Sequence, residues 1–243
     1  MTTVTSVGRT TGVLLIVQMI AGYVTNFVLL APATAPPGFL VNAAPHATSV
    51  GSAALVGIVS GAFGLAIAVT MFPVVRKLSE RMAFSFLALG AVGLALAVVE
   101  SAKVMSMLSL SQAYAASNGA DPASFAGLRG VVAASRNWAH FSHLLISGAT
   151  LSIFYATVYR FTLIPRALAA FGLFAVALQI ATISLPFFGG KVLFPLLAPL
   201  GLANLAAALW LIVKGCADPD ARAASRAAAA DSLARSVGPI PRS

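Results

Sequence analysis

Long apolar runs, separated by short polar segments, recur along most of the chain. A helix that crosses the hydrocarbon core of a bilayer needs about 20 predominantly apolar residues. The runs that reach this length cover residues 11–31, 50–74, 83–108, 138–159, 165–188 and 192–213. Because these runs are continuous and do not alternate between apolar and polar residues, they predict helices and not barrel strands. The fold class predicted is all-α: a polytopic transmembrane bundle of six spans within a domain of residues 1–215.

The amino-acid composition points to the same environment. Hydrophobic residues make up 59% of the chain and charged residues 9%, whereas a soluble domain carries roughly 25% charged residues. So few charges could not cover the surface of a folded soluble protein, and the lipid bilayer is therefore the expected partner. The net charge of +9 comes from residues between the apolar runs. Because no basic stretch has interleaved aromatic residues, we expect no nucleic-acid partner.

The distribution of basic residues predicts the topology. One side of the predicted bundle holds eleven of them: Arg9, Arg76, Lys77, Arg81, Arg160, Arg166, Lys214, Arg222, Arg226, Arg235 and Arg242. The other side holds four: Lys103, Arg129, Arg136 and Lys191. Loops rich in Lys and Arg stay in the cytoplasm. We therefore expect both termini to be cytoplasmic, in a multi-pass protein of the inner (plasma) membrane.

The segments at and between the spans carry further expectations. The first apolar run is longer than a signal-peptide core of 7–15 residues, so we interpret it as a retained span. Four prolines make residues 32–48 an extended or irregular loop, and residues 122–134 could form a short interfacial helix. Pro195 and Pro199 predict that the sixth helix kinks or begins late. Residues 216–243 are expected to form a mobile cytoplasmic tail.

Glu100 is the strongest candidate for a functional side chain, because a charge at membrane depth is costly. Lys103 follows three residues later and projects from the same helix face. A site for an ion, a proton or a ligand is one interpretation. The other is a structural pair near the outer interface, with Lys103 extending to the headgroups.

A second group of polar residues opens the fourth span. Arg136, His140 and His143 have the spacing i, i+4, i+7 and so lie on one helical stripe. With Glu100 at a similar depth and His46 in the first outer loop, His140 and His143 could complete a three-His, one-carboxylate metal site of zinc character, or hold a haem edge. No metal motif accompanies them, and two buried, hydrogen-bonded histidines are the alternative. We predict no cofactor, with zinc or haem as the alternatives.

Several smaller features concern helix packing. Gln18, Asn26, Gln179 and Asn204 interrupt the apolar runs, and such amides either bond across helices or line a central cavity. Gly57 and Gly61 form a GxxxG pattern, which permits close helix contact within one chain or in a homo-oligomer.

Three short motifs resemble a known family of bacterial membrane proteins. They are residues 163–172 (LIPRALAAFG), which resemble the entry to that family's fifth helix, residues 208–215 (ALWLIVKG), which resemble the end of its sixth, and residues 9–12 (RTTG), which resemble the entry to its first. The family is the domain of unknown function four-three-eight-six. The resemblance covers about residues 8–215 and implies six spans with no assigned activity. A His early in the fourth helix is also typical of the family, but Leu96 and Ala97 stand where many members carry an Arg before the acidic position.

These observations predict a membrane protein whose polar cavity, lined by Glu100, His140 and His143, opens outward and binds or passes a small molecule or ion. Two alternatives stay open. One is a membrane-embedded metal enzyme that uses these residues with His46. The other is a structural or assembly protein that acts through its helix faces.

Overall fold

Six long helices run lengthwise through the protein, and the prediction of six spans is confirmed. The computed structural model describes residues 3–117 and 121–218, and within them six helices are long and apolar enough to cross a membrane. They are α1 (Val4–Tyr23, continued by a π-helix over Val24–Leu29), α4 (Ala47–Leu78), α5 (Glu80–Ala116), α6 (Pro122–Arg160), α7 (Arg166–Ser184, continued by a 3-10 turn over Leu185–Phe188) and α8 (Ala198–Lys214, preceded by a 3-10 turn over Phe194–Leu197). Each predicted span falls on one of these helices.

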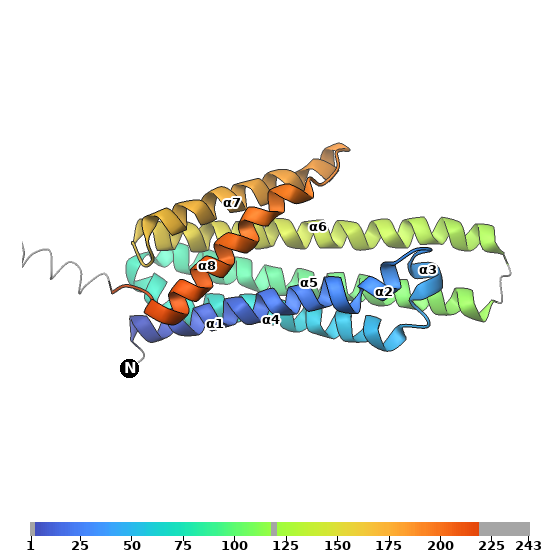
Figure 1. Cartoon of the computed structure of the whole chain (residues 1–243), viewed down its shortest axis with the longest axis horizontal. Coiled ribbons are helices and arrows are strands. Elements are labelled where there is room, and N and C mark those ends of the chain that lie inside the picture. Colours follow the sequence, from blue (N-terminus) through green and yellow to red (C-terminus); the bar gives the residue numbers. More distant parts are fainter. Residues whose placement is uncertain (1–2, 118–120, 219–243) are drawn as a thin grey trace, which may run out of the picture.

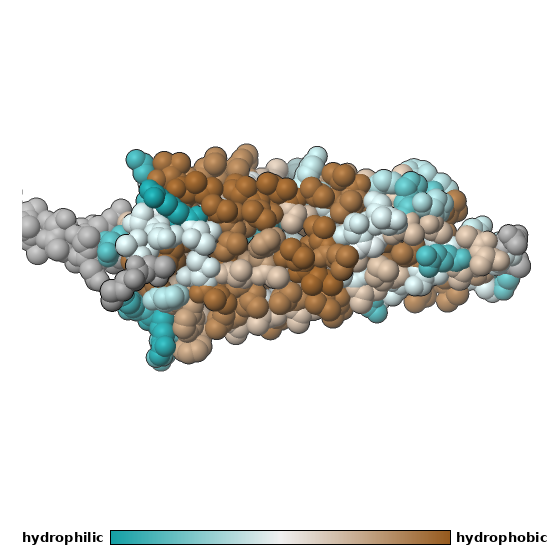
Figure 2. All heavy atoms as spheres, turned by 90° about the horizontal axis from the view of Figure 1, so that it is seen from below, coloured by the Kyte–Doolittle hydropathy of each residue, from teal (hydrophilic) through white to brown (hydrophobic). Residues whose placement is uncertain are grey.

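The surface carries a band of hydrophobic side chains around the middle of the bundle, with hydrophilic residues gathered at one end and a mixed surface at the other (Figure 2). Large apolar side chains of the spanning segments are exposed, including Phe27 at 69% and Leu202 at 63%. Such side chains are stable on a surface that meets hydrocarbon. The chain is therefore a six-span membrane protein.

The helices form a closed ring in chain order. Extensive contacts join α1 to α4, α4 to α5, α5 to α6, α6 to α7 and α7 to α8, and α8 returns to α1. Figure 1 shows α8 crossing the bundle obliquely, from the far end of α7 to the start of α1. In a ring of six helices, the space along the central axis is reached only by side chains. The site described below lies in this space.

Both ends of the described chain lie at one end of the bundle, called here the terminal end (Figure 1). The segment after α8 packs there against α1 and the α6–α7 turn, where the Ala217 amide donates to the Leu163 carbonyl at 2.9 Å. Cys216 is buried at this contact, and burial raises the pKa of its thiol to about 12. Gly8 permits this segment to lie close to α1, since a Cβ at position 8 would lie 3.0 Å from the Cys216 sulfur. The predicted tail continues from here, and residues 219–243 lie outside the described part.

At the opposite end, called the loop end, α5 and α6 extend further than predicted. The expected interfacial helix over residues 122–134 is the first part of α6, which runs without a break for 39 residues. With 1.5 Å per residue, α5 is about 55 Å long and α6 about 58 Å, well beyond the ~30 Å of a bilayer core. Figure 1 shows both continuing past the end of α7. The apolar runs marked the membrane-crossing part of these helices but not their polar continuations.

Of the two forms predicted for the first loop, extended or irregular, the structure shows the irregular one. Residues 32–48 are not extended: two single-turn helices, α2 (Ala31–Thr34) and α3 (Phe39–Asn42), fold the segment onto α5. Phe39 and Leu30 pack with Val50, Val104 and Leu108 in a small hydrophobic core at the loop end. Ser111 ties the loop to α5, since its hydroxyl donates to the Leu40 carbonyl at 2.9 Å and accepts from the Ala44 amide at 2.8 Å.

Prolines and glycines act largely as predicted. The sixth span begins late, with a 3-10 turn before α8. Pro73 lies inside α4, which continues beyond it to Leu78. The GxxxG pair packs within the chain: a Cβ at Gly61 would lie 2.6 Å from the Ala97 Cβ, and one at Gly57 would lie 3.1 Å from the Ser101 hydroxyl, both on α5.

Candidate functional site

Glu100 and the polar stripe of α6 lie at the same depth in the bundle. Glu100 follows the start of α5 at Glu80, and His140 precedes the end of α6 at Arg160, by the same number of residues. The two helices are antiparallel neighbours, so each side chain is about 30 Å from the terminal end. This distance is similar to the thickness of a bilayer's hydrocarbon core, about 30 Å.

Arg136, His140 and His143 all contact the Glu100 carboxylate. One oxygen, Oε1, lies 2.7 Å from Nδ1 of His140, and the other, Oε2, lies 2.9 Å from Nδ1 of His143. The Arg136 guanidinium lies 3.6 Å from Oε1. The side chains are 16–25% exposed. The structure thus brings together four of the residues that the sequence singled out, and we call them the Glu100 cluster.

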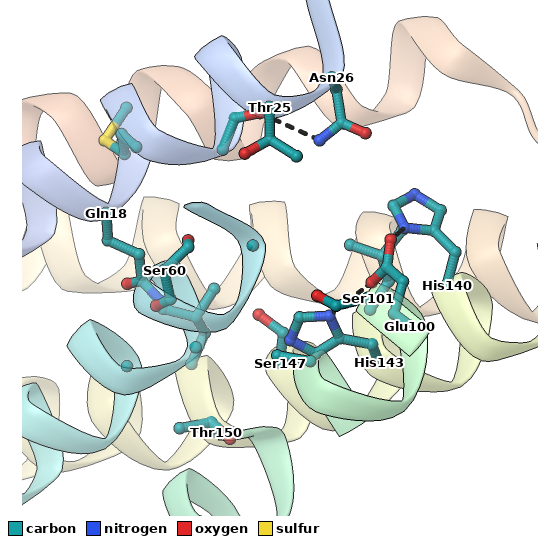
Figure 3. Close-up of a pocket in the computed structure, with 18 of the residues that line it drawn as sticks. Gln18, Thr25, Asn26, Ser60, Glu100, Ser101, His140, His143, Ser147 and Thr150 are labelled. Atoms are coloured by element: carbon teal, nitrogen blue, oxygen red, sulfur yellow. Dashed lines mark hydrogen bonds and ion pairs between the residues drawn. The ribbon is translucent and has the colours of Figure 1, made fainter. Parts of the chain in front are cut away.

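The Glu100 cluster fixes the tautomer of both imidazoles. A carboxylate offers only acceptors, so each Nδ1 must carry the proton and donate it. In a neutral imidazole the other nitrogen, Nε2, then has a free lone pair and is an acceptor. Figure 3 shows both rings turned so that this nitrogen points away from Glu100 and toward the pocket. The cluster therefore presents two oriented acceptors at the edge of a hollow.

That hollow is a cavity of about 320 Å³ at the centre of the ring, and all six long helices line it. Its polar residues are Gln18, Thr25, Asn26, Ser60, Glu100, Ser101, His140, His143, Ser147, Thr150, Gln179 and Asn204. Apolar residues of both hydrophobic cores, such as Phe86, Phe154 and Val104, complete the lining. Concave sites of this kind, mostly apolar with a few oriented polar groups, are typical of small-molecule sites.

The π-helix that ends the first span contributes to this lining. It places Thr25 and Asn26 at the cavity, and the Asn26 amide donates to the Gly22 carbonyl at 3.0 Å. The Thr25 hydroxyl is buried and has no hydrogen-bond partner among the described residues. Single π turns within α-helices often occur at functional sites, because they redirect side chains from the regular helical pattern.

The amides predicted to bond across helices mostly do so, and all four also line the cavity. Gln18 donates to the Ser60 carbonyl at 3.4 Å, and Asn204 accepts from the Tyr155 hydroxyl at 2.7 Å. Gln179 donates through Nε2 to the Leu144 carbonyl at 3.0 Å. The two interpretations offered from the sequence are therefore both realised at these positions.

Two candidate residues do not join the cluster. Lys103 does not line the cavity, and in the part of the chain that the structure describes, Arg136 takes the place beside Glu100 that the sequence suggested for Lys103. His46 lies directly before α4, where its Nδ1 bonds the Asn42 carbonyl at 2.8 Å. Among residues 3–117 and 121–218, no group of three or more His, Cys, Asp or Glu side chains is placed to hold a metal ion.

Sequence reasoning missed the small hydroxyl residues of the lining. Ser147 and Thr150 continue the helical spacing of His140 and His143 along α6, so the stripe extends further than the ionisable residues alone indicated. Gly148 is a second missed signal. A Cβ there would lie 2.8 Å from Ile180, so its absence lets α7 bring Gln179 against the α6 backbone.

A six-span helical ring with a cluster of ionisable residues facing a central cavity defines the class of this protein. Residues 10–215 match the family described as Domain of unknown function (DUF4386). The chain therefore belongs to this family, as the sequence motifs indicated. No curated protein and no solved structure matches it.

Proposed function

We propose that this protein binds a small, largely apolar molecule in the central cavity, within the membrane. The observation that carries the proposal is the pair of imidazoles that Glu100 orients toward a cavity of about 320 Å³. A bundle that needed only structural stability would gain more from filling this axis with apolar side chains, because a cavity costs packing energy. An unfilled polar centre is therefore best explained by an occupant.

The charge distribution supports a cavity that lies toward the outside of the cell. Most basic residues of the sequence belong to the segments at the terminal end, for example Arg76, Lys77 and Arg81 between α4 and α5. By the positive-inside rule this end would face the cytoplasm. The Glu100 cluster, about 30 Å along α5 from this end, then lies in the outer half of an inner (plasma) membrane. The cavity would take up or pass its ligand from that side.

The two other interpretations from the sequence have less support. A metal enzyme would need further ligands beside the two free Nε2 atoms, but His46 bonds the Asn42 carbonyl outside the cavity, and among the described residues no group of three or more His, Cys, Asp or Glu side chains is placed to hold a metal ion. An assembly protein acting through the GxxxG pattern would need Gly57 and Gly61 on an outer face, but both face α5. Ligand binding without an enzymatic step uses all the features of the site.

A blocked cavity provides the test. Gly22 lines the cavity, and a Cβ there meets no atom within 4 Å, so Gly22→Phe should fill the cavity without disturbing the fold. Gly93→Phe is the matched control, because Gly93 has the same open surroundings but does not line the cavity. The protein in nanodiscs is screened for thermal stabilisation by a library of small apolar and amphipathic compounds. We expect compounds that stabilise the wild type and Gly93→Phe but not Gly22→Phe. If no compound distinguishes the wild type from Gly22→Phe, the proposed function is wrong.

A further inference from the structure

We propose that the cavity selects an uncharged molecule with an elongated apolar body and a head group that donates hydrogen bonds, of which an alcohol is the simplest. This inference rests on the proposed function and specifies its ligand class. It follows from three features of the lining: which polar atoms are free, how the charges balance, and where the apolar residues lie.

The free polar atoms beside the Glu100 cluster are acceptors. The Nδ1 atoms of His140 and His143 are committed to Glu100, so each neutral ring offers only the Nε2 lone pair to the cavity. Among the described residues no hydrogen bond reaches either Nε2 atom. A ligand that carries only acceptors would leave these lone pairs unsatisfied, which costs binding energy.

Gln179 supplies an independent acceptor. Its side chain is on the cavity lining, and the residue is 3% exposed. Its Nε2 donates to the Leu144 carbonyl, which can only accept, so the orientation of the amide is fixed. The remaining oxygen, Oε1, is buried and has no hydrogen-bond partner in the described part of the chain. Buried polar atoms normally have hydrogen-bond partners. A donor on a ligand would provide one for this oxygen, whose amide group bonds Leu144, the residue after His143.

The charges of the cluster favour an uncharged ligand. The negative charge of Glu100 is already offset by the Arg136 guanidinium at 3.6 Å, and a histidine adds no negative charge in either of its protonation states. The site therefore has no surplus negative charge that would compensate for removing an ammonium group from water. A hydroxyl group can donate to the same acceptors at a much lower cost of desolvation.

The apolar residues define where the body of the ligand would lie. Phe86 on α5 and Phe154 on α6 line the cavity toward the terminal end, with Leu15, Ile67 and Leu151. Phe86 precedes Glu100 on one helix by about 20 Å of helical rise. The cavity is thus elongated, with the acceptors of the Glu100 cluster in its loop-end half and Phe86 and Phe154 toward the other end, so a linear chain fits it better than a compact ring.

The experiment compares two isomers that differ only in the ability to donate. 1-Nonanol and 1-methoxyoctane contain the same atoms in chains of similar length, but only the alcohol has an O–H group. Nonan-1-amine, a cation at neutral pH, tests the charge argument. Each is added at the same membrane concentration to the protein in nanodiscs, and thermal stabilisation is measured for the wild type and for Gly22→Phe, which reports general effects on the bilayer.

We expect the alcohol to bind the wild type at least about tenfold more tightly than the ether or the amine, because one donor-to-acceptor bond is gained without a charge being desolvated. Gln179→Leu should reduce this preference severalfold, and so should His143→Phe. The control His46→Gln should keep the preference, because His46 lies outside the cavity.

Three results would overturn the inference. An ether that binds as well as the alcohol would contradict donor selection, and an amine that binds better would contradict selection for an uncharged head. In both cases cavity-dependent binding, and with it the proposed function, would still hold. If all three compounds affect Gly22→Phe as much as the wild type, the alcohol class is wrong, and the compound library then decides whether the cavity binds any ligand.

Discussion

Glu100 has a double role at the scale of single residues. Its carboxylate satisfies two imidazole donors and lies beside a guanidinium, so it joins α5 to α6. The same contacts also set the direction in which His140 and His143 face. A carboxylate that orients a histidine through Nδ1 is a common arrangement wherever the other ring nitrogen has a function. Structure and proposed binding chemistry therefore depend on the same few atoms.

Substitution of Glu100 by Gln should destabilise the protein. The amide retains the size of the side chain but replaces one acceptor by a donor, so one imidazole loses its partner or must change tautomer. We expect a loss of about 1.5–3 kcal/mol in the free energy of unfolding, the range for a hydrogen bond to a charged group. Equilibrium unfolding in mixed micelles would measure it.

Glu80→Gln is the matched control for this change. Glu80 forms an ion pair with Arg76 at 3.5 Å, but the two side chains are 65% and 57% exposed. Exposed pairs contribute little, so this variant should stay within about 1 kcal/mol of the wild type. Equal losses in the two variants would mean that Glu100 is no more important to the fold than a surface charge.

At the scale of helices, small residues determine how closely the ring closes. Gly61 permits close contact of α4 with Ala97 on α5. Gly12 permits close contact of α1 with α8, since a Cβ at position 12 would lie 2.7 Å from the Ala208 carbonyl oxygen. In hydrocarbon no hydrophobic effect drives helices together, so close packing of this kind carries much of their association. The diameter of the cavity follows from these contacts.

Two glycines of α4 should respond in opposite ways to replacement by Ala. Gly61→Ala introduces a methyl group 2.6 Å from Ala97, and such overpacking typically costs about 1–3 kcal/mol. Gly51→Ala meets no atom within 4 Å and should be neutral or stabilising by up to about 1 kcal/mol, because Ala favours the helix. Thermal unfolding of both variants checks the difference. Similar effects would show that α4 and α5 are not packed through Gly61.

Element by element, the sequence predicted what depends on hydrophobic length and missed what depends on tertiary contact. The six spans follow from apolar runs, and the late start of α8 follows from its prolines. The extensions of α5 and α6 lie outside the apolar runs, so the helix predicted over residues 122–134 was not recognised as the start of the fourth span. The folding of residues 32–48 depends on hydrogen bonds to Ser111, which lies far along the chain. In the site, helical spacing predicted that His140 and His143 share a face. The sequence did not predict that Glu100 pairs with Arg136 and not with Lys103, because this depends on how α5 packs against α6.

For the whole molecule, the ring arrangement explains why the polar residues converge. Each of the six helices contributes at least one polar group or a glycine to the central axis, although no single helix contains a recognisable binding motif. Two hydrophobic cores, one at each end of the bundle, flank this axis and fix its ends. The ring thus brings polar residues that are isolated in their own spans together around one cavity.

The central claim is that Glu100 holds two imidazoles with their Nε2 lone pairs facing this cavity. Nitrogen-15 NMR of histidine-labelled protein tests it most directly, because the chain has only three His residues and His46→Gln leaves the two of the cluster. At pH 8, where a free imidazole is neutral, we predict that both rings carry the proton on Nδ1 and that a donor ligand such as 1-nonanol shifts the Nε2 signals in the wild-type cavity but not in Gly22→Phe. Protonation of Nε2 in both rings would contradict the account.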